Sequence, residues 1–139
     1  MRFVMMLIGA CGCSASTGPG DAGIDASPAA IGAQAFTRRG CPDCHQSSGS
    51  GQTSPLLGTQ VYPANITHDV DTGIGSWKDE DVERAIRQGF APGFVPLCSQ
   101  MARYNKMSDD EVIAIIAFLK SLPPVHNAVP KSVCPPIKG

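Results

Sequence analysis

Cys41-Pro42-Asp43-Cys44-His45 is the stretch that decides the fold of this 139-residue chain. Two cysteines separated by two residues and followed directly by histidine are typical of c-type haem attachment, in which the thiols bond to the haem vinyl groups and the histidine binds iron. The alternatives are a redox-active cysteine pair and half of a zinc site. A zinc site needs a second pair of Cys or His at ligand spacing, and none follows. The run therefore predicts one covalent haem c with its iron.

Helix signals precede this run. Ser27 followed by Pro28 is typical of an N-cap and a first helical position, and good helix formers fill residues 29–39. Gly40 is the expected stop. A thioredoxin-like pair would open a helix after a buried strand, whereas this run closes a helix-like stretch and continues into Gly and Ser.

Two further helices are predicted downstream. Ser76 and Asp79 form a start that resembles a capping box, and Gly89 lies where a left-handed C-cap belongs. Ser108 with Glu111 begins the last helix. Its apolar stripe comprises Val112, Ile115, Ile116, Leu119 and Leu122, and it ends at Pro123-Pro124. Because no long alternating segment indicates a strand, we expect an all-α fold of three or more helices, with long loops wrapped around the haem.

The two ends of the chain have their own signals. Residues 1–13 read as a leader and its junction, with a positive residue, a short apolar run and then Cys11. The residues before Cys11 resemble a lipobox, which predicts lipidation there; plain secretion is the alternative. Residues 14–27 are small and polar and predict a flexible tether. One domain is expected over residues 28–125 and a Pro-rich tail over residues 126–139. The expected location is the periplasm or cell envelope, and lipidation of Cys11 would anchor the protein to the membrane.

Composition excludes one class of partner. Charged residues make up 17% of the chain and the formal net charge is -1. Binding to nucleic acid depends on neutralising phosphates with a concentration of Lys and Arg, which this chain lacks. Nucleic acid is therefore not an expected partner.

Cys98 and Cys134 remain once the leader and the haem run have taken the other cysteines. In an oxidising compartment an even remainder usually pairs, so we expect a disulfide between them. This bridge would pin the tail to the loop before Met101. Free thiols or metal ligands are the alternative for these two residues.

The second iron ligand is expected to be a methionine, because a soft thioether favours ferrous iron and raises the reduction potential. Met101 lies on a loop with no helical periodicity and is the predicted ligand. Met107 lies just before the last helix and can pack on its first turn as a hydrophobic staple. His68 and His126 are the alternative ligands if Met101 is only a core residue.

His45 itself needs an orienting partner. One ring nitrogen would bind iron, and the other N–H should donate to a backbone carbonyl. Pro55 is the candidate for that carbonyl, with an ordinary turn proline as the alternative.

Several of these motifs together resemble a class I monohaem cytochrome c domain, over about residues 28–125. The resemblance implies that the first and last helices cross at small and aromatic side chains, which are here Gly32, Phe36 and Phe118. The stretch 65–77 is similar to the haem domains of cytochrome c subunits of bacterial membrane-bound alcohol, gluconate and related dehydrogenases.

The narrower resemblance implies further haem-binding residues. Trp77 would donate its indole N–H to a haem propionate, with a core anchor at a helix start as the alternative. Asn65 is a further candidate in the same stretch. Tyr104 would line the same side of the pocket, with a surface position as the alternative.

The function that these features indicate is electron transfer by a His/Met-ligated haem, without catalysis. The first alternative is the cytochrome subunit of a periplasmic dehydrogenase complex. The second is a haem sensor or a peroxidase-like enzyme with an open iron site. The expected partners are redox proteins such as a dehydrogenase or a terminal oxidase.

Overall fold

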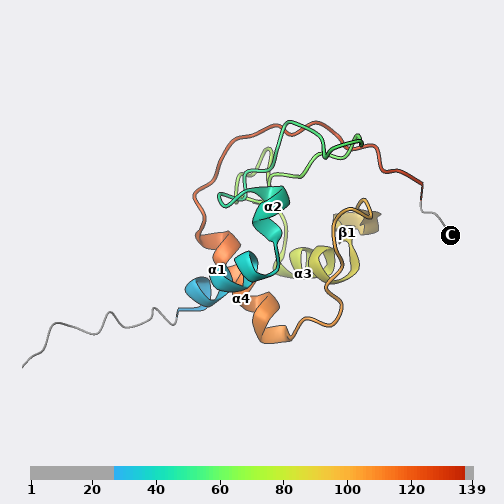
Figure 1. The fold of residues 1–139 in the computed structure, drawn as a ribbon. Helices are drawn as coiled ribbons and strands as arrows, with labels where there is room; N and C mark the ends of the chain where they lie inside the picture. The colour runs from blue at the N-terminus through green and yellow to red at the C-terminus, as the bar shows by residue number, and fades with distance from the viewer. Residues whose placement is uncertain (1–26, 137–139) are drawn as a thin grey trace, which may run out of the picture.

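The computed structural model describes residues 27–136, and Figure 1 shows their helices below a layer of loops. The helices are α1 (Pro28–Arg38), α2 (Cys41–His45), α3 (Asp79–Gln88) and α4 (Asp109–Ser121), with a short 3-10 turn, η1 (Pro92–Phe94). Strands β1 (Phe90–Ala91) and β2 (Val95–Pro96) pair antiparallel, with Phe90 opposite Pro96. The helical prediction is confirmed, but the all-α class is not exact. Strands of two residues are too short to produce an alternating pattern in the sequence.

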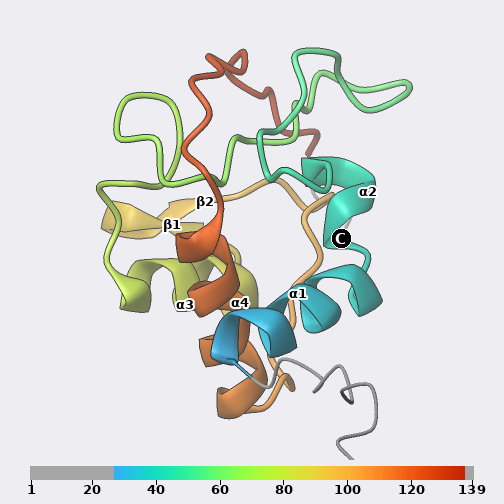
Figure 2. The same ribbon diagram turned by 90° about the vertical axis from the view of Figure 1, so that its left-hand side faces the viewer.

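The crossing of α1 and α4 is the main helix contact, and the two helices lie side by side in Figures 1 and 2. Gly32 allows the close approach, since a Cβ at this position would lie 1.9 Å from the Ala114 carbonyl oxygen. Beside it the rings of Phe36 and Phe118 pack with their centroids 5.2 Å apart. The crossing at Gly32, Phe36 and Phe118 is therefore confirmed.

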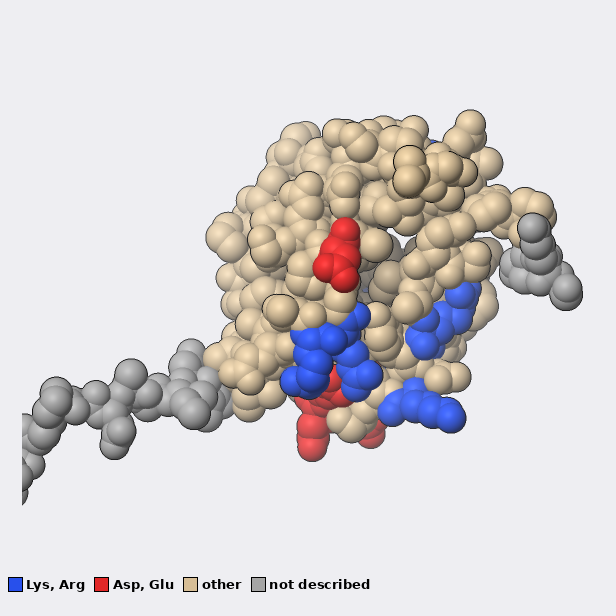
Figure 3. All heavy atoms as spheres, in the orientation of Figure 1, with Lys and Arg blue, Asp and Glu red and all other residues tan. Residues whose placement is uncertain are grey.

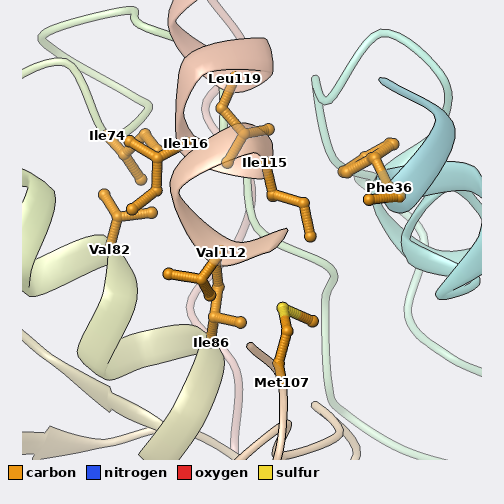
Figure 4. Packing of buried hydrophobic residues seen from close by; sticks show 10 residues of the cluster. Phe36, Ile74, Val82, Ile86, Met107, Val112, Ile115, Ile116 and Leu119 are labelled. Atoms are coloured by element: carbon orange, nitrogen blue, oxygen red, sulfur yellow. The ribbon is translucent and has the colours of Figure 1, made fainter. Parts of the chain in front are cut away.

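A cluster of buried apolar side chains joins α1, α3 and α4 (Figure 4). Its members include Phe36, Ile74, Val82, Ile86, Met107, Val112, Ile115, Ile116 and Leu119. Met107 and Val112 belong to this cluster, as expected for a staple across the start of α4. The core thus fixes α3 and α4 against each other.

Most of the predicted helix ends are present. The Ser27 hydroxyl accepts from the Ala30 amide at 3.2 Å, and the Ser108 hydroxyl accepts from the Glu111 amide at 3.3 Å. Gly89 has a φ of 75° at the end of α3. These residues satisfy backbone groups that a helix end leaves without partners.

The predicted start of α3 at Ser76 is wrong. The Trp77 amide donates to the Ile74 carbonyl at 2.9 Å, so residues 74–77 form a turn. The helix begins at Asp79 after Lys78, whose amide donates to the Asp81 carboxylate at 3.4 Å. Trp77 also packs against the core, which holds the chain in the turn.

The tail returns over the loops instead of leaving the domain, as its red trace in Figure 1 shows. We call residues 125–134 the C-terminal strap. The Asn65 side-chain NH₂ donates to the Val125 carbonyl at 2.7 Å, and the Asn127 side chain donates to the Ser50 carbonyl at 2.8 Å. Farther along, the Val133 amide donates to the Gln60 carbonyl at 2.9 Å. The strap therefore covers the loop that follows α2.

The predicted leader (1–13) with Cys11, and the tether up to residue 26, lie outside the described residues. Between residues 27 and 136 no helix is both long and apolar enough to cross a membrane.

Candidate functional site

The haem-attachment run forms α2, a single helical turn set at an angle to α1. Gly40 lies between the two helices with a φ of 72°, a conformation that glycine adopts without strain. Within α2, Cys41 and Cys44 are three residues apart, so their thiols lie on the same side of the turn. Both line one large cavity. Burial raises the pKa of the Cys41 thiol, which favours its protonated form.

His45 ends α2 and lines the same cavity. Its Nδ1 lies 2.8 Å from the Ala64 carbonyl oxygen, so Nδ1 carries the proton and donates to that oxygen. Burial lowers the pKa of the imidazole, although the bond to Ala64 opposes this effect. A neutral ring with Nε2 free is the form that binds a metal.

The expectation that Pro55 supplies the carbonyl for His45 is wrong. Pro55 is exposed and lies outside the cavity wall. The loop after α2 runs outward and returns, and it is tied by the Gln52 amide, which donates to the Pro63 carbonyl at 2.9 Å. Because the loop returns in this way, the Ala64 carbonyl lies beside His45, although Pro55 is closer to His45 in the sequence.

The cavity has a volume of about 680 Å³ and mostly apolar walls. Its lining contains every predicted cofactor-binding residue except Pro55, namely Cys41, Cys44, His45, Asn65, Trp77, Met101 and Tyr104. His68 and His126 do not line it. The fold therefore brings together thiol, imidazole and thioether groups that are up to 60 residues apart in the sequence.

The two candidate methionines both reach the cavity, but they differ in their surroundings. Met107 is 5% exposed and belongs to the buried core. Its carbonyl accepts a hydrogen bond from Arg87. Met101 is partly exposed and lies on the loop between β2 and α4, outside the core cluster. Of the two methionines, Met101 is therefore the one whose side chain is not part of the buried core and can bind a ligand in the cavity.

The other predicted pocket residues use their polar groups differently. Asn65 is buried, and its side chain bonds to Thr67, Thr72 and Val125, so the amide joins the strap to the loop. The Tyr104 hydroxyl donates to the Arg39 carbonyl at 2.9 Å. Trp77 packs against the core and, within the described residues, its indole N–H has no hydrogen-bond partner. Trp77 therefore has a donor that remains available to a ligand in the cavity.

Sequence reasoning missed several residues of the cavity wall. Arg39 lies there with its guanidinium over the Tyr104 ring, 5.9 Å from the centroid. Gln100 also lines the wall, and its Oε1 is buried without a partner among residues 27–136. Lys131 and Ser132 come from the strap. An arginine two residues before the first haem cysteine was visible in the sequence, but no local pattern marks the others.

The disulfide between Cys98 and Cys134 is present, with the two Cα atoms 5.0 Å apart. Both cysteines line the cavity. The alternative of free thiols or metal ligands at these positions is therefore excluded.

The surface around the site is unevenly charged. No Asp, Glu, Lys or Arg occurs in the sequence between Asp43 and Asp69. Figure 3 shows this uneven distribution of charge on one face of the molecule. The upper half of that face, which loops and the strap form, is almost free of charged side chains, and most Lys, Arg, Asp and Glu side chains lie below it.

A small helical domain that lines a large apolar cavity with two thiols and an imidazole on one turn defines the class of c-type haem proteins. The family model for cytochrome c matches residues 29–123, and the chain belongs to the cytochrome c family. Membership implies covalent haem c and a role in electron transfer.

Three relatives are similar at modest identity. A subunit of nicotinate dehydrogenase from Pseudomonas putida is 31% identical over 82% of this chain and 10% of that protein. A dihaem cytochrome c-type protein of Cereibacter sphaeroides is 32% identical over 72% of this chain and 38% of that protein. The gluconate 2-dehydrogenase cytochrome c subunit of Pantoea cypripedii is 33% identical over 63% and 22% respectively. The chain thus spans less than two fifths of each relative.

The residues of the cavity fit haem c. Its volume of about 680 Å³ lies within the roughly 300 to 1,000 Å³ of cofactor pockets. The apolar walls suit a macrocycle, and the thiols of Cys41 and Cys44 would hold it covalently. The Trp77 indole N–H is a donor still without a partner in the described part of the chain, and it suits a haem propionate, whose carboxylate accepts hydrogen bonds.

Proposed function

We propose that this chain is an electron carrier with a single haem c, in which His45 and Met101 are the axial ligands. The observation that supports it most directly is the lining of one cavity by both thiols, a pre-oriented imidazole and a methionine on a loop. The bound haem supplies one-electron chemistry at its iron. No substrate is transformed.

Each residue has a defined task in this proposal. Cys41 and Cys44 prevent loss of the cofactor, and the Ala64 carbonyl holds the His45 ring in the orientation for binding through Nε2. Met101 raises the reduction potential, because a thioether favours ferrous iron. The apolar walls exclude water, which raises the potential further.

The proposed partner is a dehydrogenase in the bacterial cell envelope. This proposal rests on relatives that are named as dehydrogenase subunits and on the leader-like residues 1–13 with Cys11. Co-purification of a dehydrogenase with the full chain, and reduction of the haem by that enzyme with its substrate, would support it. A haem that such an enzyme leaves oxidised would contradict it.

The cofactor is tested by expressing the full chain with haem-maturation machinery. The alkaline pyridine spectrum should show one haem c per chain, and the haem should stay with the protein on denaturation. Cys41→Ala/Cys44→Ala should release it. Absence of covalent haem from the unsubstituted protein would refute the proposed function.

The ligand is tested by a matched pair of variants. Met101→Ala should abolish the methionine-to-iron charge-transfer band and lower the reduction potential. Met107→Ala should keep the band and instead lower stability by about 2 to 4 kcal/mol, because it removes a buried core side chain. Retention of the band in Met101→Ala, or rapid binding of carbon monoxide by the unsubstituted ferrous protein, would argue against His/Met ligation.

A further inference from the structure

The C-terminal strap is bonded to two separate parts of the cavity wall, one close in sequence to the Ala64 carbonyl that orients His45 and the other close to Met101. On the side of His45, the Ser132 hydroxyl accepts from the Tyr62 amide at 2.8 Å and lies 3.2 Å from the Tyr62 carbonyl oxygen. Tyr62 is only two residues from Ala64, whose carbonyl orients His45. At Ser132 the strap is therefore bonded to the part of the cavity wall that carries the His45 imidazole.

Two residues later the strap is bonded to the other wall. Cys134 forms the disulfide with Cys98, which lies three residues before Met101. Ser132, Cys134 and Cys98 all line the cavity, so the bridge is part of its wall. The span from Ser132 to Cys134 thus joins the histidine side to the methionine side.

The loop that carries Met101 has few other restraints. Its own turn is closed by the Met101 amide, which donates to the Cys98 carbonyl at 3.1 Å. Within residues 27–136, the stretch 98–102 makes no hydrogen bond to any other part of the chain. Hydrogen bonds resume at Arg103 and Tyr104, which donate to the Gln88 and Ile86 carbonyls. The disulfide is therefore the strongest tie between this turn and the remaining structure.

From these contacts we propose that Ser132, Cys134 and Cys98 are positioning residues, which act as a clamp that holds the Met101 turn at a fixed position relative to the wall that carries His45. A clamp of this kind keeps the thioether at the iron by restricting the open positions of the loop. This inference deepens the proposed function and rests on Met101 as the ligand. It assigns to the strap a role in ligation in addition to stability.

The test compares holoproteins with and without the bridge. The variant Cys98→Ser/Cys134→Ser should bind imidazole to ferric iron at least tenfold more tightly than the unsubstituted protein, because the methionine competes less well. Its charge-transfer band should weaken, its reduction potential should fall, and its covalent haem content should not change. Ser132→Ala, which keeps the bridge, should show a smaller shift in the same direction.

The control is Asn127→Ala, which removes the strap's bond to the Ser50 carbonyl but keeps the disulfide. This variant should lose stability and keep the imidazole affinity of the unsubstituted protein. An equal rise in imidazole affinity for Asn127→Ala and the Cys98→Ser/Cys134→Ser variant would overturn the proposal, since general loosening would then account for both. Unchanged affinity in the doubly substituted variant would overturn it as well.

Hydrogen exchange separates this inference from the proposed ligation. Removing the bridge should speed exchange of the Met101 amide by at least tenfold, whether or not Met101 binds iron. Absence of the charge-transfer band from the unsubstituted protein would refute the proposed ligand, while the exchange result still decides the clamp. Exchange that stays unchanged would refute the clamp.

Discussion

Gly32 illustrates how the absence of one side chain allows two helices to approach each other closely. It lies inside α1, where alanine would normally be favoured by about 1 kcal/mol. A Cβ at this position would meet the Ala114 carbonyl at 1.9 Å and the Phe118 Cβ at 2.8 Å. Because backbone atoms of α4 cannot move aside cheaply, we expect Gly32→Ala to destabilise the protein by about 2 to 3 kcal/mol. Urea unfolding followed by circular dichroism measures this change.

The control for this prediction is Gln34→Ala in the same helix. Gln34 is exposed, so the substitution should leave the free energy of unfolding within about 0.5 kcal/mol of its original value. A Gly32→Ala variant as stable as the unsubstituted protein would contradict the prediction, because it would show that the space between α1 and α4 at residue 32 can hold a methyl group.

At the same scale, His45 shows what residue order can and cannot predict. The spacing of Cys41, Cys44 and His45 was sufficient to predict their common chemistry, because a helical turn places them together. The acceptor for His45 was predicted at Pro55 and lies at Ala64. A hydrogen bond to a returning loop depends on the path of that loop, which no local pattern encodes.

At the scale of elements, Glu111 links the start of α4 to the end of α1. Its carboxylate accepts from Arg39 at 2.6 Å and from Arg38 at 2.9 Å. The hydrogen bond from Arg39, with a further one from Arg38, lowers the pKa of the Glu111 carboxyl from 4.5 to about 2. A lowered pKa means that the stabilisation is complete above about pH 4.5 and is lost as the pH falls toward 2.

We therefore expect Glu111→Gln to cost about 1 kcal/mol at pH 7, since the arginines are partly exposed and solvent screens the pairs. The difference from the unsubstituted protein should shrink between pH 4.5 and pH 2, because the carboxyl is then protonated in both states. Urea midpoints measured across this pH range check the prediction. Asp110→Asn is the matched control, since Asp110 is exposed and forms no ion pair within the described residues, and at pH 7 it should change the free energy of unfolding by less than Glu111→Gln does.

The elements differ in how well the sequence predicted them. The last helix was predicted closely, since the Ser108 cap and the apolar stripe are both local signals. The N-cap of α3 was placed at Ser76 and lies at Lys78, because Trp77 packs on the core and keeps the chain in a turn. The strands β1 and β2 were missed because each has only two residues.

At the scale of the whole molecule, the cavity lies within the fold, and its mostly apolar wall includes Phe36 of α1, Val82 of α3, and Ile115 and Leu119 of α4. These four side chains also belong to the buried core. A ligand that covers this apolar wall removes it from water and adds stability to the folded state. We therefore expect the haem to form part of the core of the domain.

We expect the variant Cys41→Ala/Cys44→Ala, freed of haem, to lose its near-ultraviolet circular dichroism and its cooperative thermal transition. The Met101→Ala holoprotein is the control and should keep both, because its haem remains covalently bound. A haem-free protein that melts cooperatively with native near-ultraviolet signals would contradict the role of haem as the core of the domain.

The sequence by itself determined the cofactor class and the first and last helices, because these depend on spacing and caps. The parity of the cysteines predicted the pairing of Cys98 with Cys134, and the structure excluded the free-thiol alternative. Only the tertiary structure decided that Ala64 orients His45 and that Gln100 and Ser132 belong to the cavity wall. These contacts join residues from separate loops, and the path of each loop is set by hydrogen bonds and packing distributed over the whole domain. The strap shows this most clearly. Its disulfide to the loop before Met101 was predicted from the cysteines, whereas its bond from the Tyr62 amide to the Ser132 hydroxyl appears only in the folded chain.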